Sequence, residues 1–110
     1  MEPQELRNIH MLQDLSEEKL QKISDVANLQ IVNAETVLYR EGEYLNNLYM
    51  LLSGKIILEV DFSEDISITL GVIKPRFTIG TSALISKAKS YATAFCVEPS
   101  EVISIHTDEL

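Results

Sequence analysis

Few residues in this 110-residue chain could act as acids, bases or nucleophiles, and they lie far apart in the sequence. His10 and His106 stand near opposite ends, at a separation typical of neither a metal site nor a nucleophile–base pair. Cys96, the single cysteine, lies in the apolar run 94–97, where a thiol usually packs as a small hydrophobic side chain. These residues favour structural roles, and they predict a protein that is not an enzyme and holds no metal.

Charge is unevenly distributed along the chain. The segment 66–97 contains four of the nine basic residues and none of the 17 acidic ones, so it carries +4 while the rest carries −12. A turn at Gly80, followed by the helix-starting residues Thr81 and Ser82, lies in its middle, and free N–H groups at a helix start attract anions. This pattern predicts a phosphate-binding site. The alternative is that the four basic residues, Lys74, Arg76, Lys87 and Lys89, are solvated loop charges, and charge alone does not separate the two interpretations.

The overall composition excludes several other classes. A net charge of −8 opposes non-specific binding to nucleic acid or to anionic membranes, both of which attract clustered cations. A single cysteine cannot form an intrachain disulfide, which favours a reducing compartment and a cytoplasmic location. The acidic N-terminus lacks the features of a signal peptide, and no apolar run is long enough to span a membrane.

The chain begins with a helical pattern and continues with short strands. Ser16 is the expected N-cap of a helix whose apolar residues recur at helical spacing, and a shorter helix is expected upstream. Beyond position 28, runs rich in β-branched and aromatic residues predict seven strands of a β-sandwich or barrel, with a hairpin tip at 61–65. The predicted strands are Leu29–Val32, Thr36–Tyr39, Asn47–Leu52, Lys55–Val60, Ile66–Ile73, Tyr91–Val97 and Glu101–His106. Alternation from Ile66 to Leu70 predicts apolar side chains on one face and hydroxyls on the other, and Gly80–Ile85 is expected to form a short helix.

Four motifs occur in an order that resembles the cyclic nucleotide-binding domain family. They are Val-Leu-Tyr-Arg-Glu-Gly-Glu at 37–43, Leu-Tyr-Met-Leu-Leu-Ser-Gly-Lys-Ile at 48–56, Ile-Gly-Thr-Ser-Ala-Leu-Ile at 79–85 and Tyr-Ala-Thr-Ala at 91–94. That family includes bacterial regulators of the catabolite activator type and the regulatory subunits of protein kinase A. The resemblance covers about residues 12–110. It implies one mainly β domain over 1–110: helices in 1–28, a double-stranded β-helix (a jelly-roll-like β-roll) in 29–106 with a short cassette helix, and the start of a truncated C-terminal helix in 107–110 with Thr107 as its N-cap.

The resemblance also implies a ligand site. In the family's phosphate-binding cassette a glutamate holds the ribose 2′-hydroxyl and an arginine pairs with the cyclic phosphate. This chain has Thr81 at the position of the glutamate and Ser90 at that of the arginine. Losing the arginine contact removes about 1.5–3 kcal/mol, roughly one to two powers of ten in affinity. Lys87 or Lys89 is a candidate substitute charge, and Tyr91 is expected either to stack on a base or to occupy a strand edge. The expected ligand-binding residues are Gly80, Thr81, Ser82, Ala83, Lys89, Ser90, Tyr91, Ala92 and Thr93.

The resulting functional prediction is a regulatory, allosteric sensor domain with no cofactor. It is expected to bind a cyclic nucleotide (cAMP or cGMP) weakly, or another small anion. It is expected to act on an effector outside this chain, and the chain is expected to be a fragment of a transcription regulator. The resemblance further implies a homodimer formed through C-terminal helices that follow the β-roll in relatives. The alternative is a structural or protein-interaction module with a vestigial pocket. No helix-turn-helix is present, so direct nucleic-acid binding by these residues is not expected.

Overall fold

The computed structural model describes residues 2–84 and 88–109, apart from the side chain of Ala83. Helical segments come first along the chain: α1 (Pro3–Leu6), the 3₁₀ helix η1 (His10–Leu12) and α2 (Glu17–Val26). The strands are β1 (Asn28–Val32), β2 (Val37–Tyr39), β3 (Asn47–Ser53), β4 (Ile56–Ser63), β5 (Ile66–Ile73), β6 (Thr78–Ile79), β7 (Thr93–Cys96) and β8 (Ser100–His106). Two further 3₁₀ helices complete the order, η2 (Thr81–Leu84) and η3 (Thr107–Glu109).

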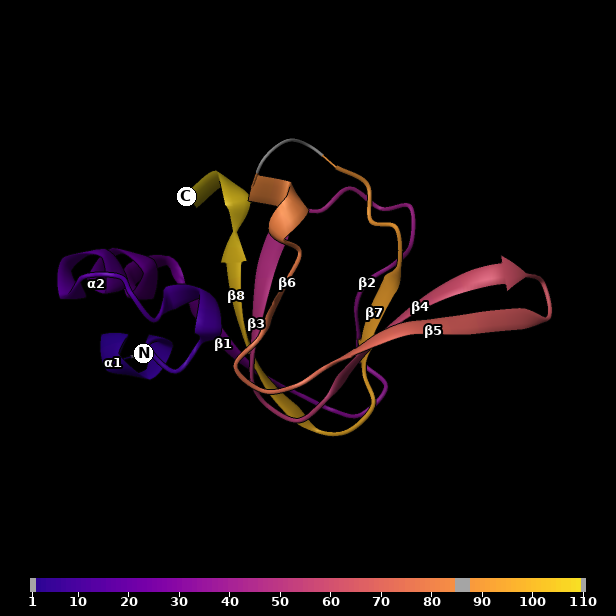
Figure 1. The fold of residues 1–110 in the computed structure, drawn as a ribbon, viewed down its shortest axis with the longest axis horizontal. Helices are drawn as coiled ribbons and strands as arrows, with labels where there is room; N and C mark the ends of the chain where they lie inside the picture. The colour runs from indigo at the N-terminus through magenta and orange to yellow at the C-terminus, as the bar shows by residue number, and fades with distance from the viewer. Residues whose placement is uncertain (1, 85–87, 110) are drawn as a thin grey trace.

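The strands form two antiparallel four-stranded sheets. One sheet has the order β1-β8-β3-β6 and the other the order β2-β7-β4-β5. Figure 1 shows the helices beside the first sheet, on the side away from the second, and the β4–β5 hairpin projecting from the opposite end of the molecule. The prediction of a mainly β, jelly-roll-like fold with N-terminal helices is confirmed.

The seven predicted strands are all present, but the sequence prediction missed β6. This strand has only two residues, Thr78 and Ile79, which pair with Met50 and Tyr49 of β3. Two residues are too few to show strand periodicity, so only the partner strand defines it. The predicted strand at 91–97 begins later, at Thr93, and the predicted hairpin tip is shorter because β4 continues to Ser63.

The helices cover an apolar face of the first sheet. Leu48 and Met50 of β3 and Ile103 and Ile105 of β8 are at most 2% exposed and point toward them. Each such buried side chain contributes about 1.5–3 kcal/mol through removal of apolar surface from water. The buried helical residues of this cluster are Leu6, Ile9, Leu12 and Leu20.

A second apolar cluster lies between the two sheets. Leu51 and Val102, on the other faces of β3 and β8, are fully buried there, so both central strands are covered on both sides. Cys96 is also fully buried in this cluster, and burial raises the pKa of its thiol. This agrees with the expectation that the thiol packs as a small hydrophobic group.

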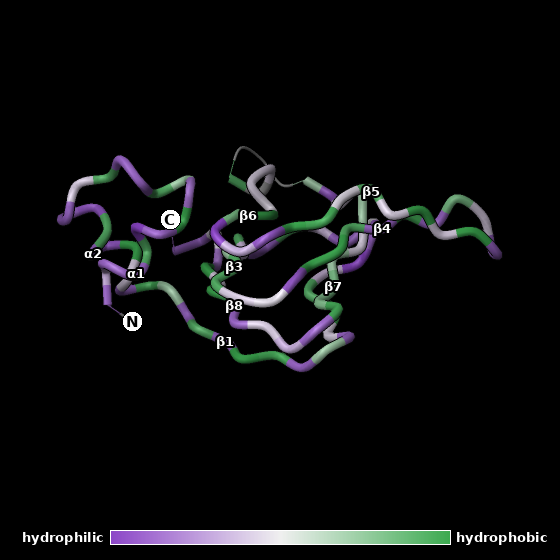
Figure 2. The backbone as a smooth tube through the Cα atoms, turned by 60° about the horizontal axis from the view of Figure 1, so that its bottom comes forward, coloured by the Kyte–Doolittle hydropathy of each residue, from purple (hydrophilic) through white to green (hydrophobic). Residues whose placement is uncertain are grey.

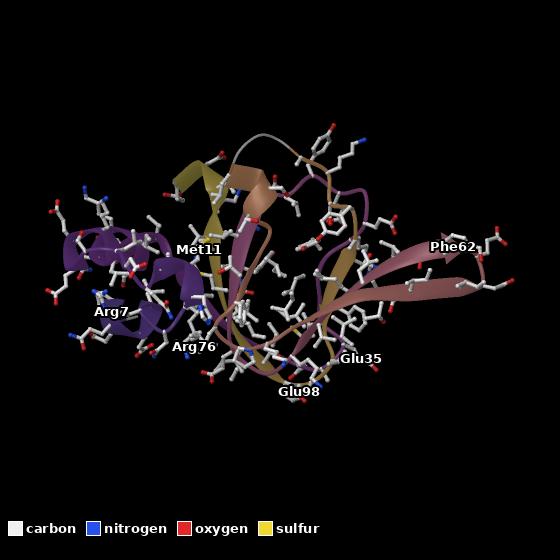
Figure 3. All side chains as sticks on the ribbon, in the orientation of Figure 1. Arg7, Met11, Glu35, Phe62, Arg76 and Glu98 are labelled. Atoms are coloured by element: carbon white, nitrogen blue, oxygen red, sulfur yellow. The ribbon has the colours of Figure 1, made fainter. Side chains whose placement is uncertain are left out.

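The β4–β5 hairpin does not have the simple alternating faces that the sequence predicted. Its register shifts between Leu58 and Glu59, where β5 has one extra residue, so Leu70 lies between the paired residues Thr69 and Gly71. Such a bulge interrupts the period of two along a strand. In Figure 2 hydrophobic segments lead along the hairpin to a hydrophilic tip, and Figure 3 shows Phe62 near its far end.

The turn between β5 and β6 is attached to the N-terminal helical region. The backbone N–H of His10 donates to the carbonyl of Arg76 at 2.8 Å, and the guanidinium Nε of Arg76 donates to the carbonyl of Asn8 at 2.6 Å. The rings of His10 and Phe77 stack with their centroids 4.6 Å apart. His10 therefore has a structural role in holding the chain that leads into β6.

Helix ends partly follow the sequence predictions. Ser16 caps α2 as predicted, because its hydroxyl accepts a hydrogen bond from the backbone N–H of Lys19 at 3.3 Å. The predicted N-cap Thr107 is wrong. His106 supplies the cap instead, since its Nδ1 accepts from the N–H of Asp108 at 3.3 Å, while the Thr107 hydroxyl donates to the carbonyl of Asn46.

Candidate functional site

A cavity of about 230 Å³ opens between the β6–η2 turn and the second sheet. Its walls come from segments that are far apart in the sequence, brought together by the folding of the two sheets over one another. Its lining residues are Tyr39, Leu45, Leu58, Ile73, Thr78, Ile79, Gly80, Thr81, Ser82, Ser90 and Tyr91. Five of the nine predicted ligand-binding residues, Gly80, Thr81, Ser82, Ser90 and Tyr91, are among them.

The first wall is the turn from β6 into η2. Gly80 has a φ of +84°, and a Cβ at this position would lie 2.8 Å from the carbonyl oxygen of Asn47. Both the backbone conformation and the space therefore require glycine. The turn places Thr81 and Ser82 on the cavity wall, where both side chains are exposed.

The second wall is the loop that precedes β7. Its backbone is tied to the turn after β2, because the N–H of Gly42 donates to the carbonyl of Ser90 at 2.8 Å and the N–H of Ser90 donates to the carbonyl of Glu43 at 2.7 Å. The Ser90 side chain is only 5% exposed. Its hydroxyl donates to the carbonyl of Ala92 and accepts from the N–H of Ala92. Ser90 thus shapes the loop from within.

Two tyrosines contribute aromatic surface to the cavity. Tyr91 is 69% exposed and lies outside any strand, which answers the question of whether it occupies a strand edge. Burial raises the pKa of Tyr39 to about 12, with further increases from Tyr91 and Tyr49 and a partial decrease from the Ser90 hydroxyl. The Tyr39 hydroxyl therefore stays protonated near pH 7 and interacts with the Ser90 hydroxyl.

Three of the remaining predicted residues have other environments. The Nζ of Lys89 lies 5.3 Å from the centroid of the Tyr44 ring, a cation–π contact away from the cavity wall. Ala92 is 1% exposed, and the Thr93 hydroxyl accepts from the backbone N–H of Glu41 at 2.9 Å. The side chain of Ala83 and the alternative cation, Lys87, lie outside the described residues.

The residues that line the cavity carry no charge within the described part of the chain. No charged side chain there stands in for the glutamate or the arginine that the sequence resemblance leads one to expect. The cavity offers hydroxyl groups, backbone groups of a glycine turn, two aromatic rings and aliphatic walls. Such a set can bind a ligand through neutral hydrogen bonds and apolar contacts.

Sequence reasoning missed the lining residues that come from strands. Tyr39 lies within the motif at 37–43, which was a usable signal, whereas Leu58 and Ile73 look like any core residue of a strand. Thr78 had no signal because its strand was not predicted. Its Oγ1 atom is buried and has no hydrogen-bond partner among the described residues.

The described residues contain neither a metal-binding cluster nor a membrane-spanning helix. No group of three or more histidine, cysteine, aspartate or glutamate side chains is placed to hold a metal ion there. Across the same residues, no helix has the length and apolar character needed to cross a membrane.

The chain resembles known proteins in both its sequence pattern and its fold. Residues 29–110 match the family model described as "Cyclic nucleotide-binding domain". A search of curated proteins found no match. The matched segment includes the whole lining of the cavity.

Solved structures share the fold. A cyclic nucleotide-binding-like protein from Brucella abortus superposes with a TM-score of 0.84 at 22% identity, over 98% of this chain and 92% of that one. The regulatory domain of Toxoplasma gondii PKA, crystallised with cAMP, gives 0.85 at 23% identity over 98% of this chain. The sensor domain of the transcriptional regulator DNR from Pseudomonas aeruginosa gives 0.84 at 24% identity, over 96% of this chain and 71% of that one. This chain spans 41% of the length of the Toxoplasma protein.

Proposed function

Because this chain belongs to the cyclic nucleotide-binding domain family, we propose that it is a non-catalytic regulatory sensor domain whose cavity binds a cyclic nucleotide weakly, or another small anion. One observation carries the proposal. The fold brings the Gly80–Ser82 turn and the Ser90–Tyr91 loop, which are separate in sequence, onto the walls of one open cavity.

Weak binding follows from the chemistry of the wall. The described lining has no cation to pair with a phosphate, so among the described residues an anion is held by hydroxyl groups and backbone N–H groups. Charge-assisted hydrogen bonds contribute about 1.5–3 kcal/mol, against about 0.5–1.5 kcal/mol for neutral ones. The cavity of about 230 Å³ is also smaller than the roughly 300 Å³ at which pockets begin to enclose drug-sized ligands.

The proposed mechanism is a shift between two conformational populations. A ligand that contacts both η2 and the loop before β7 stabilises the arrangement in which these segments approach each other. The proposed effector is a separate domain or protein, and homodimerisation is part of the proposal. We also propose a cytoplasmic setting, because the single cysteine, Cys96, is a free thiol and free thiols are typical of reducing compartments.

Titration of the purified chain with cAMP and cGMP, by calorimetry and thermal shift, tests the proposal. We expect saturable binding with a dissociation constant in the high micromolar to millimolar range, and a rise in Tm with ligand concentration. Two exposed tyrosines supply a matched pair of variants. Tyr91→Ala should weaken binding because Tyr91 lines the cavity, whereas Tyr44→Ala should not, because Tyr44 lies outside it. Absence of heat and of any Tm shift at millimolar ligand contradicts the nucleotide version.

The second candidate function is a structural or protein-interaction module with a vestigial pocket. It is favoured by the uncharged lining and by the Ser90 hydroxyl, which is already occupied by the backbone of Ala92. Under this alternative the wild-type chain is stably folded yet binds cAMP, cGMP and inorganic phosphate no better than the Tyr91→Ala variant does.

A further inference from the structure

We propose that the free edge of β5 is a self-association surface, on which the β5 strand of a second copy of this chain pairs in antiparallel orientation about a two-fold axis. This rests on the homodimerisation part of the proposed function and goes further, because it names the surface and the orientation of the two copies. It does not require the cavity to bind a ligand.

β5 (Ile66–Ile73) lies at the end of its sheet and pairs with β4 alone among the described residues. The outer backbone N–H and C=O groups of such an edge have no strand beside them, which makes the edge a template for another strand. β5 is the longest of the four sheet edges, with eight residues against five in β1, three in β2 and two in β6. In Figure 1 the β4–β5 hairpin extends beyond the rest of the molecule, so this edge is open to a second copy.

The side chains along this edge are apolar and exposed. Four of the eight are large hydrophobic residues with between 41% and 51% of their surface in solvent, namely Ile66, Ile68, Leu70 and Val72. β5 contains no charged residue and no proline, the residues with which natural edge strands commonly resist pairing. Pairing with a second strand therefore meets no repulsion within β5 and removes apolar surface from water.

The bulge at Leu70 determines which register fits. Ser67 and Val72, on either side of the bulge, pair with two β4 residues that are four positions apart, Asp61 and Ile57. Residues four positions apart on a regular strand share a face, so Ser67 and Val72 share a face although they are five positions apart. Directly opposite residues of an antiparallel pair also share a face. The bulge thus allows two copies to pair about the centre of β5.

The two ends of β5 carry charges of opposite sign. Glu64 and Asp65 precede the strand and Lys74 follows it; all three are exposed, and none forms an ion pair with another described residue. When two copies pair about the centre of β5, Ile66 lies opposite Ile73 of the second copy, and Asp65 therefore lies opposite Lys74. Opposite charges then meet at both ends of the paired strands, whereas parallel pairing places like charges together.

β1, the edge nearest to β5 in length, lacks this complementarity. It is also free of charge, and its Ile31 is 80% exposed. The nearest charged residues before and after it in the sequence are Asp25 and Glu35, both acidic. Two copies paired along β1 bring only like charges toward its ends, so the charge pattern favours self-association through β5.

The first test is sedimentation velocity of the wild-type chain and two matched variants. We expect a monomer–dimer equilibrium with a dissociation constant on the order of 100 µM, because one strand edge is smaller than a standard interface of roughly 1,600 Å². Ile68→Lys places a charge within the edge and should weaken dimerisation at least about tenfold. Ile31→Lys makes the same change of side chain and net charge on β1, and should dimerise as the wild type does. Thermal unfolding checks that both variants are folded.

The second test exchanges the charges at the ends of β5. Lys74→Glu makes both ends acidic and Asp65→Lys introduces a cation at the acidic end, so each variant alone should self-associate at least about threefold more weakly than the wild type. An equimolar mixture of the two variants places opposite charges at both ends of a mixed pair. The mixture should therefore dimerise about as strongly as the wild type, which two misfolded variants could not do.

The outcomes separate this proposal from the proposed function. If the wild-type chain dimerises but Ile68→Lys does so equally well, or if Ile31→Lys abolishes dimerisation, β5 is not the interface and the proposal is overturned while homodimerisation stands. A mixture that associates no better than its components overturns the antiparallel orientation. A monomeric wild-type chain overturns both the proposal and homodimerisation. Binding of cAMP is measured separately, because Asp65, Ile68 and Lys74 do not line the cavity.

Discussion

Thr81 and Ser90 stand at the positions where the sequence resemblance leads one to expect a glutamate and an arginine, and both line the cavity. Their hydroxyls leave the site neutral within the described residues. Lys89 directly precedes Ser90 in the sequence, but its ammonium group lies over the Tyr44 ring. The chemistry of the cavity therefore differs from that of the family cassette at the level of single side chains.

Restoring the two charges should restore affinity. We expect the double variant Thr81→Glu/Ser90→Arg to bind cAMP about ten- to a hundredfold more tightly than the wild type, because a charge-assisted arginine–phosphate contact contributes about 1.5–3 kcal/mol. Calorimetric titration measures the change. Ser67→Arg, on exposed β5, is the control for a non-specific effect of added positive charge. If affinity is unchanged in a folded double variant, the arginine introduced at position 90 in the loop before β7 does not reach the phosphate of the ligand.

Glycine substitutions should have graded effects that depend on the space at each turn. Gly42 and Gly54 both have positive φ, +88° and +97°, but a Cβ has open space at Gly42 and overlaps the side chain of Ser100 at Gly54. Gly42→Ala should lower the free energy of unfolding by about 1–2 kcal/mol through backbone strain alone. Gly54→Ala should add about 1–3 kcal/mol of steric cost to a similar strain. Urea unfolding measures both, and equal losses would contradict the assignment of the overlap.

At the scale of elements, the helices and the two sheets depend on each other. Leu20 of α2 is buried in the cluster that also holds residues of β3 and β8, while the exposed side of α2 carries charged residues. The β4–β5 hairpin projects from the second sheet with apolar side chains on its surface, including Phe62, which is 74% exposed. The helical side of the molecule thus has a continuous core, and the hairpin has little core beyond its base.

The N-cap of α2 provides a test of the element's local contribution. Ser16→Ala should lower the free energy of unfolding by about 1 kcal/mol, because the N–H of Lys19 loses its acceptor. Lys22→Ala on the same helix is the control. It removes only an exposed ion pair with Glu18, 3.8 Å apart, and should change stability by less than about 0.5 kcal/mol. A larger loss in Lys22→Ala than in Ser16→Ala would contradict this ranking.

For the molecule as a whole, stability at high pH depends on groups buried between the sheets. The pKa of Tyr39 is raised from 10.0 to about 12 in the folded chain, chiefly by burial, so the folded state holds this proton more tightly than the unfolded state does. The resulting stabilisation is complete below pH 10 and is lost as the pH rises from about 10 to about 12. The raised pKa of Tyr49 acts in the same direction.

The pH dependence can be assigned by substitution. We expect the free energy of unfolding of the wild-type chain to fall more steeply between pH 10 and 12 than that of Tyr39→Phe, which cannot ionise at this position. Urea unfolding at intervals across this range measures both slopes. Lysine deprotonation is common to both chains and cancels in the comparison. Parallel curves would show that the Tyr39 proton is not held more tightly by folding.

Local patterns in the sequence determined the order of elements. The N-cap at Ser16, the glycine turns and the short apolar runs are properties of neighbouring residues, so they predicted α2 and all the strands except β6. The motifs around Gly42, Gly54 and Gly80 predicted the family, because turns that need a positive φ tolerate little besides glycine. Five of the nine predicted site residues line the cavity.

Only the tertiary structure decided how the site is composed. β6 exists because β3 lies beside it, and it places Thr78 on the cavity wall. Tyr39 of β2 reaches the same wall as Leu58 and Ile73 of the β4–β5 hairpin, and β2 joins that hairpin only through β7 in the sheet. Lys89 looked like a ligand contact in the sequence, but the bridge between Lys89 and Tyr44 directs it to an aromatic ring. Local sequence specifies turns and caps through short-range sterics and hydrogen bonds, whereas a cavity wall is made of long-range contacts that no single segment contains.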